Sequence, residues 1–340
     1  MTELSLQPVG ALRGVIRGPV NAEKIVTVPD TPWVITSGMM SASVPYGRLY
    51  AVDTRDGACQ EIYPHRVGSR HDAATYGAAP DALDPLVFEP HGLDVLRHED
   101  GRYSLYVVNH GGRESVEVFD LDVSGVTPTL VWRGGVVLPR GTWPNDVAPL
   151  ADGGFIVSNT ADPDTEGLQA GMARMFDGAE TIGAVEWHPG SGFTDVQGSR
   201  MPGANGIVAS KDGRRVFIGG WRNKDVVRII RDGGPGGAVQ VDRVQLDILV
   251  DNLTWAPDGA ILAAGAFDTT PTQIFTCFGT KDSCFFPCKV LRIDPDTFDV
   301  TEAVVYGTDT FGLGTTGLAV GDEIWVSSAR AAGIARFASA

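Results

Sequence analysis

The sequence predicts an all-β fold, a six-bladed β-propeller with four antiparallel strands in each blade. One pattern recurs along the chain, as in residues 145–158, 203–220 and 251–265. In these copies a polar residue (Asn145, Asn205 or Asp251) is followed seven positions later by the Asp of an Asp-Gly turn. Apolar runs of strand length flank these turns, as in β-hairpins. Long amphipathic helical patterns are absent, and the 43 glycines suit a turn-rich β architecture.

Six copies of the pattern can be placed along the chain, and each opens on a residue that we call an anchor. The mean spacing of roughly 59 residues is typical of architectures in which each repeat is one supersecondary unit. The anchors are Glu23, His91, Asn145, Asn205, Asp251 and Thr316.

Further strands follow the hairpins in the order that a propeller blade requires. We expect third strands at residues 47–53, 115–122, 225–230 and 289–294, and fourth strands at 239–246 and 299–307. The sixth repeat ends at residues 333–340 without room for a fourth strand, so the N-terminal segment 11–18 is expected to supply it and close the ring. The prediction is one propeller domain over residues 1–340.

Charge and hydropathy argue against several classes of partner. The formal net charge of −15 disfavours nucleic acid and an anionic membrane surface. No apolar run approaches the ~18 residues of a membrane span, and residues 1–10 lack the basic and apolar regions of a secretory signal. We therefore expect a cytoplasmic protein that acts on a small molecule.

Three of the four cysteines, Cys277, Cys284 and Cys288, form a C-x6-C-x3-C pattern in and just after the long loop 267–287. The pattern matches no usual zinc site, since no histidine lies nearby. It allows one local disulfide, but in a cytoplasmic protein we expect free thiols.

The anchors should meet at one mouth of the central channel, because the first strand of every blade lines that channel. Two carboxylates and at least two side-chain amides then converge there, and burying them unpaired would cost several kcal/mol per group. A hard cation with six to eight oxygen ligands removes this cost, and Ca²⁺ fits the donor set better than zinc or Mg²⁺. The alternative is a water-filled polar channel with ordinary hydrogen bonds.

Two further features of this mouth suggest a reaction. His91 and His110 flank the second blade's first hairpin, so both approach the mouth and form a candidate general base beside a cation. Taken alone, each histidine would be interpreted as a structural residue held by hydrogen bonds.

Aromatic residues such as Trp143, Trp221 and Phe275 lie in or near the loops on this face, which favours an apolar or aromatic substrate.

Four strings carry a family resemblance, and they extend over nearly all of the expected blades. They are FEPHGLDVLRHEDGRYSLYVVNH (88–110), PNDVAPL (144–150), ANGIVASKDGRRVFI (204–218) and LVDNLTWAPDG (249–259). Together they resemble the paraoxonase/arylesterase family and, more distantly, gluconolactonase-type propellers. The resemblance implies a six-bladed propeller that hydrolyses lactones and aryl esters with a catalytic Ca²⁺ in its channel. It implies calcium ligands at Glu23, Asn145, Asn205, Asp251 and Asn252, and a histidine dyad of His91 and His110.

The chain departs from that family at Lys24. The family binds a second, structural calcium with an acid at this position and with the Asp that corresponds to Asp146. We expect the Lys24 ammonium to form a salt bridge with Asp146 and to replace this ion, so that one catalytic Ca²⁺ is bound.

The predicted function is that of a calcium-dependent lactonase or arylesterase-like hydrolase. The ion would polarise the substrate carbonyl, and His91, assisted by His110, would deprotonate the attacking water. Asp251 is a second candidate for this work, as base or nucleophile. The alternative function is a catalytically silent propeller that binds a ligand or a partner.

Overall fold

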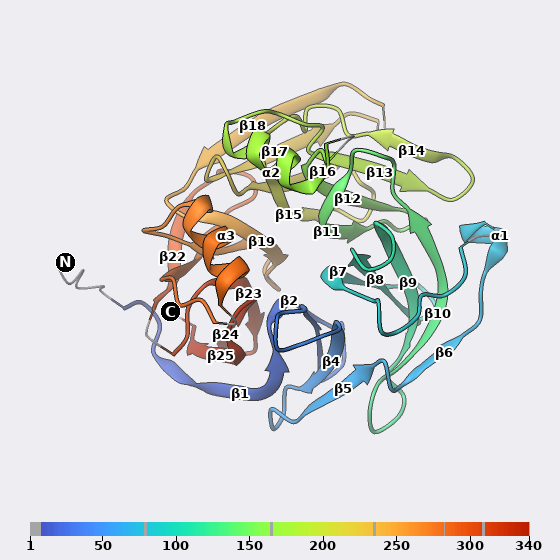
Figure 1. Cartoon of the computed structure of the whole chain (residues 1–340), viewed down its shortest axis with the longest axis horizontal. Helices are drawn as coiled ribbons and strands as arrows, with labels where there is room; N and C mark the ends of the chain where they lie inside the picture. Colours follow the sequence, from blue (N-terminus) through green and yellow to red (C-terminus); the bar gives the residue numbers. More distant parts are fainter. Residues whose placement is uncertain are drawn as a thin grey trace.

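Six sheets surround a central axis in the computed structural model, which describes residues 8–77, 80–163, 166–233, 236–281, 283–307 and 310–339 (Figure 1). The first three blades consist of β2 (Ala22–Thr27), β3 (Trp33–Gly38), β4 (Arg48–Asp53) and β5 (Cys59–Tyr63); β7 (Pro90–Arg97), β8 (Tyr103–Asn109), β9 (Ser115–Asp122) and β10 (Thr129–Val137); and β11 (Trp143–Pro149), β12 (Phe155–Ala161), β13 (Ala184–His188) and β14 (Gly192–Asp195). The last three consist of β15 (Ala204–Ala209), β16 (Arg215–Gly220), β17 (Asp225–Arg231) and β18 (Val239–Gln245); β19 (Leu249–Trp255), β20 (Ile261–Ala266), β21 (Cys288–Ile293) and β22 (Val300–Tyr306); and β23 (Gly314–Val320), β24 (Glu323–Ser328), β25 (Ala332–Ala338) and β1 (Leu12–Val20). The predicted six-bladed propeller is confirmed.

The N-terminal strand β1 closes the ring as the outermost strand of the sixth blade, as expected from the sequence. It pairs antiparallel with β25, with Ile16 opposite Ile334. Side chains also join β24, β25 and β1. Arg336 on β25 donates two hydrogen bonds of 2.7 Å to Glu323 on β24. Arg13 on β1 lies 3.4 Å from the same carboxylate. The first and last parts of the chain therefore share one sheet, which stabilises the closed ring.

Four short elements lie in the connections, where the repeat pattern predicts none. The strand β6 (Val67–Ser69) pairs in parallel with β10 and gives the second blade a fifth strand, and α1 (Ala73–Tyr76) follows it. The helices α2 (Leu168–Phe176) and α3 (Pro271–Thr280) lie in the loops after β12 and β20. No helix in the described ranges is both long enough and apolar enough to cross a membrane.

The start of α3 follows from its local sequence. Thr270 accepts a hydrogen bond from the Gln273 N–H, the Gln273 side chain accepts one from the Thr270 N–H, and Pro271 occupies the first turn. This capping box with an early proline is a readable helix start. It was missed because the helix is only 10 residues long and shows no extended apolar period.

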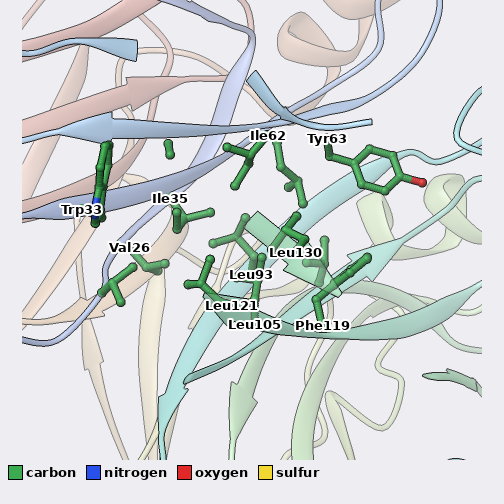
Figure 2. Packing of buried hydrophobic residues seen from close by; sticks show 14 of the residues in the cluster. Val26, Trp33, Ile35, Ile62, Tyr63, Leu93, Leu105, Phe119, Leu121 and Leu130 are labelled. Carbon is green, nitrogen blue, oxygen red and sulfur yellow. The ribbon is translucent and has the colours of Figure 1, made fainter. Parts of the chain in front are cut away.

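The hydrophobic core lies between adjacent blades. Between the first two, Ile35 on β3 belongs to one buried cluster with Leu93, Leu105 and Phe119 of the second blade (Figure 2), and none of the four is more than 2% exposed. Burying a side chain of this size contributes roughly 1.5–3 kcal/mol. Because a blade has a neighbour on each face, its inner strands are buried on both sides, as β3 is along its whole length.

Candidate active site

Each of the six innermost strands contains a β-bulge at its anchor. In β15 two residues, Asn205 and Gly206, oppose the single residue Gly219 of β16. The same two-against-one arrangement recurs in the other five blades. A bulge re-aims the side chains of its strand, and this explains why Asn205 stands where an apolar residue would be the better strand former. The bulge pairs are residues 23–24, 91–92, 145–146, 205–206, 251–252 and 315–316.

The first residues of the bulge pairs all line one cavity. They are Glu23, His91, Asn145, Asn205, Asp251 and Thr315. The sixth anchor predicted from the sequence, Thr316, is therefore wrong by one residue. Asp322 does lie seven residues after Thr315, but the turn reads Gly-Asp rather than Asp-Gly and so hid the correct register.

The second residues of the pairs lie where neighbouring inner strands approach one another. A Cβ atom at Gly92 or at Gly206 would lie 2.4 Å from the backbone oxygen of Asn145 or Asp251, respectively. Glycine is required at both positions for this close approach. The ring of anchors is consequently tight enough for side chains from different blades to meet.

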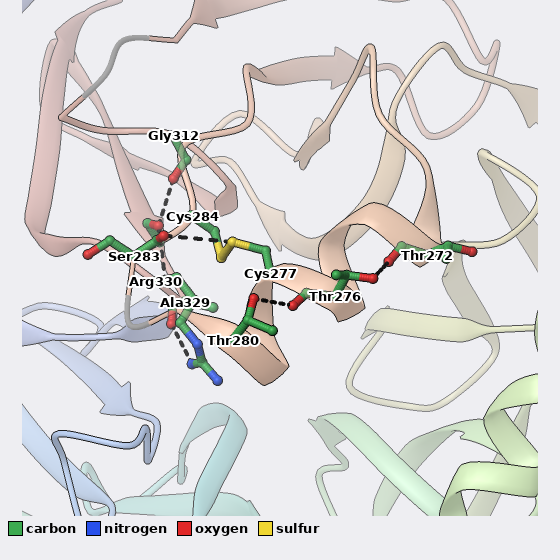
Figure 3. Close-up of a disulfide and its surroundings, with 10 residues drawn as sticks. Thr272, Thr276, Cys277, Thr280, Ser283, Cys284, Gly312, Ala329 and Arg330 are labelled. Carbon is green, nitrogen blue, oxygen red and sulfur yellow. Dashed lines mark hydrogen bonds between the residues drawn. A yellow bond between two sulfur atoms is a disulfide. The ribbon is translucent and has the colours of Figure 1, made fainter.

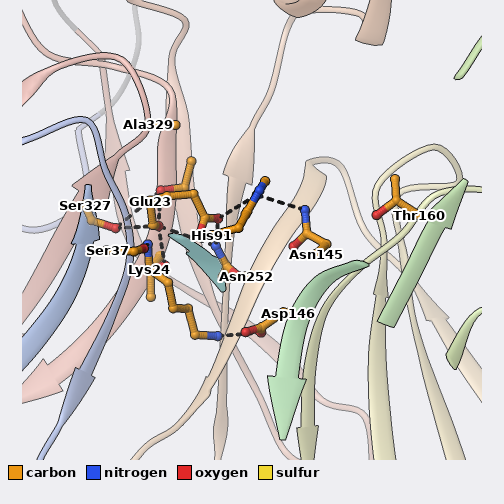
Figure 4. Close-up of polar contacts among 12 residues, drawn as sticks. Glu23, Lys24, Ser37, His91, Asn145, Asp146, Thr160, Asn252, Ser327 and Ala329 are labelled. Carbon is orange, nitrogen blue, oxygen red and sulfur yellow. Dashed lines mark hydrogen bonds and ion pairs between the residues drawn. The ribbon is translucent and has the colours of Figure 1, made fainter. Parts of the chain in front are cut away.

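Four buried acceptor oxygens near this mouth have no hydrogen-bond donor among the described residues: Glu23 Oε2, Asn145 Oδ1, Asn205 Oδ1 and Asn252 Oδ1. The other Glu23 oxygen accepts a 2.5 Å hydrogen bond from Asn252 Nδ2 (Figure 4). Leaving a buried acceptor unpaired costs about 1–3 kcal/mol. Carboxylate and amide oxygens are the ligands that Ca²⁺ takes in proteins, so the cluster fits a hard cation.

The two carboxyl groups of the mouth lie in an environment that disfavours their charge. Burial raises the pKa of Glu23 well above its ordinary value, and the nearby charge of Asp251 raises it further. Burial also raises the pKa of Asp251 to about 8, although Lys24 opposes this shift. Among the described residues, no three His, Cys, Asp or Glu side chains form a group that could hold a metal ion. A metal at this mouth would therefore depend on the amide oxygens.

Lys24 and Asp146, the second residues of their bulge pairs, form a buried ion pair. Lys24 Nζ lies 2.6 Å from Asp146 Oδ2 and donates a 2.8 Å hydrogen bond to the Leu253 carbonyl. The same Asp146 oxygen accepts from the Ile207 N–H at 3.0 Å. The salt bridge expected from the sequence is confirmed, and Figure 4 shows it beside the cluster around Glu23.

The histidines form a chain that ends on a carboxylate not predicted from the sequence. His91 Nδ1 lies 3.0 Å from His110 Nε2, and His110 Nδ1 lies 2.7 Å from Glu114 Oε2. The ring of Trp143 stacks on His110, with centroids 4.2 Å apart and planes inclined by 15°. On the other side, His91 Nε2 lies 3.2 Å from Asn145 Nδ2. Burial, and then the neighbouring His110 and Arg330, lower the pKa of His91 well below its ordinary value, so the ring is neutral near pH 7.

Apolar side chains form much of the remaining wall of the cavity. Two of them, Met172 and Ile274, come from α2 and α3, so both unpredicted helices contribute to the site. The aromatic wall residues are Trp143, Trp221, Phe275 and Phe278. A cavity with apolar walls and a polar floor suits a ligand whose polar group is smaller than its apolar body.

A disulfide bond lies behind this wall. Cys277, near the end of α3, is bonded to Cys284 (Figure 3). Cys59 and Cys288 are free. The expectation of free thiols is therefore wrong for the first two. After α3 the chain turns back, so that the Cα atoms of the bonded pair lie 6.1 Å apart. Because disulfides are typical of oxidising compartments, the expected cytoplasmic location stays a prediction.

Comparison with solved structures identifies other propellers. A protein assigned as a gluconolactonase is 15% identical, with 98% of this chain and 92% of that chain covered and a TM-score of 0.55. The calcium-binding protein regucalcin of Agrobacterium tumefaciens is 14% identical, with 97% and 94% covered and a TM-score of 0.54. The PQQ-bound aldose sugar dehydrogenase of Streptomyces coelicolor is 14% identical, with 98% of both chains covered and a TM-score of 0.52.

No protein-family model matches the sequence, and no curated protein matches it. At such low identities the structural likeness establishes the fold, which is that of gluconolactonase-like propellers. The more specific resemblance to paraoxonases stays a prediction. Since one of these propellers is a redox enzyme, the reaction has to be argued from the site itself.

Proposed function

We propose that this protein is a calcium-dependent hydrolase of lactones or aryl esters. The observation that carries the proposal is the placement of four unpaired buried oxygens, those of Glu23, Asn145, Asn205 and Asn252, beside a hydrogen-bonded pair of histidines. The solved structures support it in part, because propellers of this shape include a calcium-binding protein and a protein assigned as a gluconolactonase.

The cation would be held by five side chains, whose oxygens come from four of the six inner strands. Bound Ca²⁺ would supply the positive charge that polarises an ester carbonyl and stabilises the developing oxyanion. We propose one such ion in each chain, since the Lys24 ammonium already provides the positive charge beside Asp146. The proposed ligands are Glu23, Asn145, Asn205, Asp251 and Asn252.

In the proposed reaction His91 is the general base. Its ring is neutral, and its Nε2 atom faces Asn145, one of the proposed ligands. A water molecule would lose a proton to Nε2, and its oxygen would bond to the carbonyl carbon. The bond from that carbon to the alkoxide or phenoxide oxygen would then break, and the leaving oxygen would take up the proton from Nε2. Asp251 also lines the cavity and is the competing candidate for base or nucleophile.

The substrate would be a small molecule with an apolar or aromatic body. Trp221 and Phe275 have ring centroids 5.8 Å apart at the cavity wall, which is within the range of favourable aromatic contacts. A lactone ring or an aryl ester could place its carbonyl on the polar floor and its apolar part against this wall.

The test is hydrolysis by the full-length protein of a panel of lactones and aryl esters, with added Ca²⁺ and with a chelator, together with metal analysis. We expect hydrolysis that the chelator abolishes and Ca²⁺ restores. Calcium binding without hydrolysis of any panel member would instead favour a non-catalytic ligand-binding propeller. Hydrolysis that the chelator leaves unchanged would contradict the role of the metal.

A further inference from the structure

We propose that Glu114 is a positioning residue that sets the proton arrangement of both histidines, so that the unprotonated nitrogen of His91 faces the cavity. The inference rests on the proposed function for its catalytic meaning. The proton arrangement itself can be measured without any substrate or metal.

The backbone holds Glu114 firmly in place. It directly precedes β9, and its carbonyl oxygen accepts a 3.0 Å hydrogen bond from the N–H of Leu138, the residue just after β10. At the other end of the same loop, the His110 N–H donates to the Glu89 carbonyl at 3.1 Å. The loop that joins β8 to β9 therefore has both ends attached to neighbouring segments.

The fully buried Asn109 braces the interior of this loop. Its Nδ2 atom donates to the carbonyls of Gly111 and Arg113 at 3.0 and 2.8 Å, and its Oδ1 atom accepts from the Gly111 N–H at 3.1 Å. These bonds fix the path of the chain between His110 and Glu114. The 2.7 Å contact between those two side chains is thus a property of a rigid loop.

The proton arrangement follows from the order of donors and acceptors. An ionised carboxylate can only accept, so His110 must carry its proton on Nδ1, where it faces Glu114 at 2.7 Å. With that proton on Nδ1, His110 has its lone pair on Nε2, which can accept a hydrogen bond only if His91 is protonated on Nδ1, 3.0 Å away. A neutral His91 protonated on Nδ1 has its lone pair on Nε2.

The opposite end of the chain agrees with this assignment. His91 Nε2 lies 3.2 Å from Asn145 Nδ2, which is a donor and therefore requires an acceptor there. The Glu23 carboxylate also faces this atom, but its Oε1 lies 3.7 Å away, beyond hydrogen-bond distance, so it does not require a proton on Nε2. The stacked ring of Trp143 holds the plane of His110 and so keeps both of its nitrogens in line with their partners. One partly exposed carboxylate consequently determines which nitrogen of a buried histidine can take a proton.

The experiment is ¹⁵N NMR of the histidine side chains in the full-length protein without added metal, compared with Glu114→Ala and Glu114→Gln. In the wild type we expect both His91 and His110 to be protonated on Nδ1. Glu114→Ala removes the acceptor, so His110 should move toward the Nε2-protonated form and His91 should follow. Glu114→Gln keeps an acceptor oxygen and should retain much of the wild-type arrangement.

A matched control is Asp152→Ala, which removes a carboxylate 2.6 Å from Nδ1 of His188, outside the cavity. It should change the signals of His188 and leave those of His91 and His110 unchanged. In hydrolysis assays, we expect Glu114→Ala to lower kcat by about 10–100-fold with little change in KM, as for other residues that orient a reacting side chain.

Unchanged proton positions on His91 and His110 in a folded Glu114→Ala protein would overturn this inference. If Glu114→Ala does not fold, the spectra of Glu114→Gln decide. The glutamine amide can present either its oxygen or its NH2 group to His110 Nδ1, so a mixture of the two proton arrangements would support the inference, and spectra identical to those of the wild type would overturn it. A wild type that has the expected proton arrangement and hydrolyses nothing would overturn the proposed function and leave the positioning role intact.

Discussion

Lys24 Nζ lies 2.6 Å from Asp146 Oδ2 in the interior of the ring, and both side chains are almost completely buried. The two residues are 122 positions apart in the sequence and come from the inner strands of the first and third blades. A covalently attached cation thus occupies the space next to the oxygen cluster at the mouth. Lys24 is paired directly with Asp146, whereas four acceptor oxygens of the neighbouring cluster have no hydrogen-bond donor among the described residues.

Removing the Lys24 charge should destabilise the fold. Lys24→Met leaves Asp146 buried without its partner, and breaking such a pair costs about 3–5 kcal/mol of unfolding free energy. Urea denaturation measures this loss, and the double variant Lys24→Met/Asp146→Asn should recover part of it. Arg102→Met, which breaks an exposed ion pair with Asp100, should leave stability nearly unchanged. An equally small effect of Lys24→Met would show that the buried pair is not structural.

One calcium ion should bind to each chain. The proposed ligands form one cluster, and Asp146 is already paired with Lys24. Calorimetric titration of metal-free protein should therefore give a stoichiometry of one. A second ion bound through Asp146 would contradict the replacement of a structural calcium by Lys24.

Loss of either ligand carboxylate should weaken calcium binding. Glu23→Gln and Asp251→Asn preserve size but remove charge, so the remaining oxygens compete less well with water for the ion. We expect a lower calcium affinity and a smaller rise of Tm on calcium addition, because a ligand stabilises the folded state in proportion to its binding. Asp100→Asn is a suitable control, since Asp100 is exposed and outside the cavity. If a chelator left both Tm and activity unchanged, the calcium site would have to be abandoned.

Replacing His91 should separate catalysis from metal binding. His91→Gln should lower kcat by about 10²–10⁴-fold, the range of general-base catalysis, with calcium affinity nearly unchanged. Asp251→Asn should lower both quantities, because it alters a proposed ligand. His188→Gln, at a histidine on β13, should affect neither. Retention of most activity by His91→Gln would transfer the base or nucleophile role to Asp251.

The closure of the ring should depend on pH through Glu323. Hydrogen bonds from Arg336 lower the pKa of this carboxyl from 4.5 to about 2. A lowered pKa in the folded state contributes stability that is present above pH ~4.5 and is lost as the pH falls toward 2. Glu323→Gln should therefore unfold at lower urea concentration than the wild type at pH 7, and the difference should shrink at pH 3. A difference that stays constant over this range would rule out the ionised Glu323 as its source.

Reduction of the disulfide should alter substrate binding more than catalysis. The bond between Cys277 and Cys284 constrains the segment that carries Phe278 to the cavity wall. The variant Cys277→Ser/Cys284→Ser should raise KM for apolar substrates and leave kcat within a few-fold, as expected when the binding wall is loosened. Cys59→Ser is the control, because this free cysteine lies on β5. An unchanged KM would show that the disulfide does not influence the wall.

Local sequence was sufficient to predict those parts of the fold whose pattern recurs in several blades. The seven-residue spacing from Asn205 to its Asp-Gly turn, and its copies, predicted the six blades and the convergence of polar side chains. The pairing of Lys24 with Asp146 was predicted from the departure from the paraoxonase family at Lys24, and the structure confirms it. By contrast, α3 was missed although its capping residues were readable, since one short helix has no repeat to reveal it.

The sequence by itself determined the propeller, its closure by the N-terminal strand and the set of oxygen-bearing residues around the axis, because strand alternation and turn chemistry act over a few residues. Tertiary structure alone decided which atoms meet. The register of the bulge in β23 showed that Thr315 is the sixth anchor. The fold also brought Cys277 and Cys284 together in a disulfide bond. Four acceptor oxygens at the mouth have no donor among the described residues. Tertiary structure also brought Glu114 to His110. Such contacts depend on loop paths and bulges that shift a side chain by a few ångströms, and no local pattern records a shift of that size.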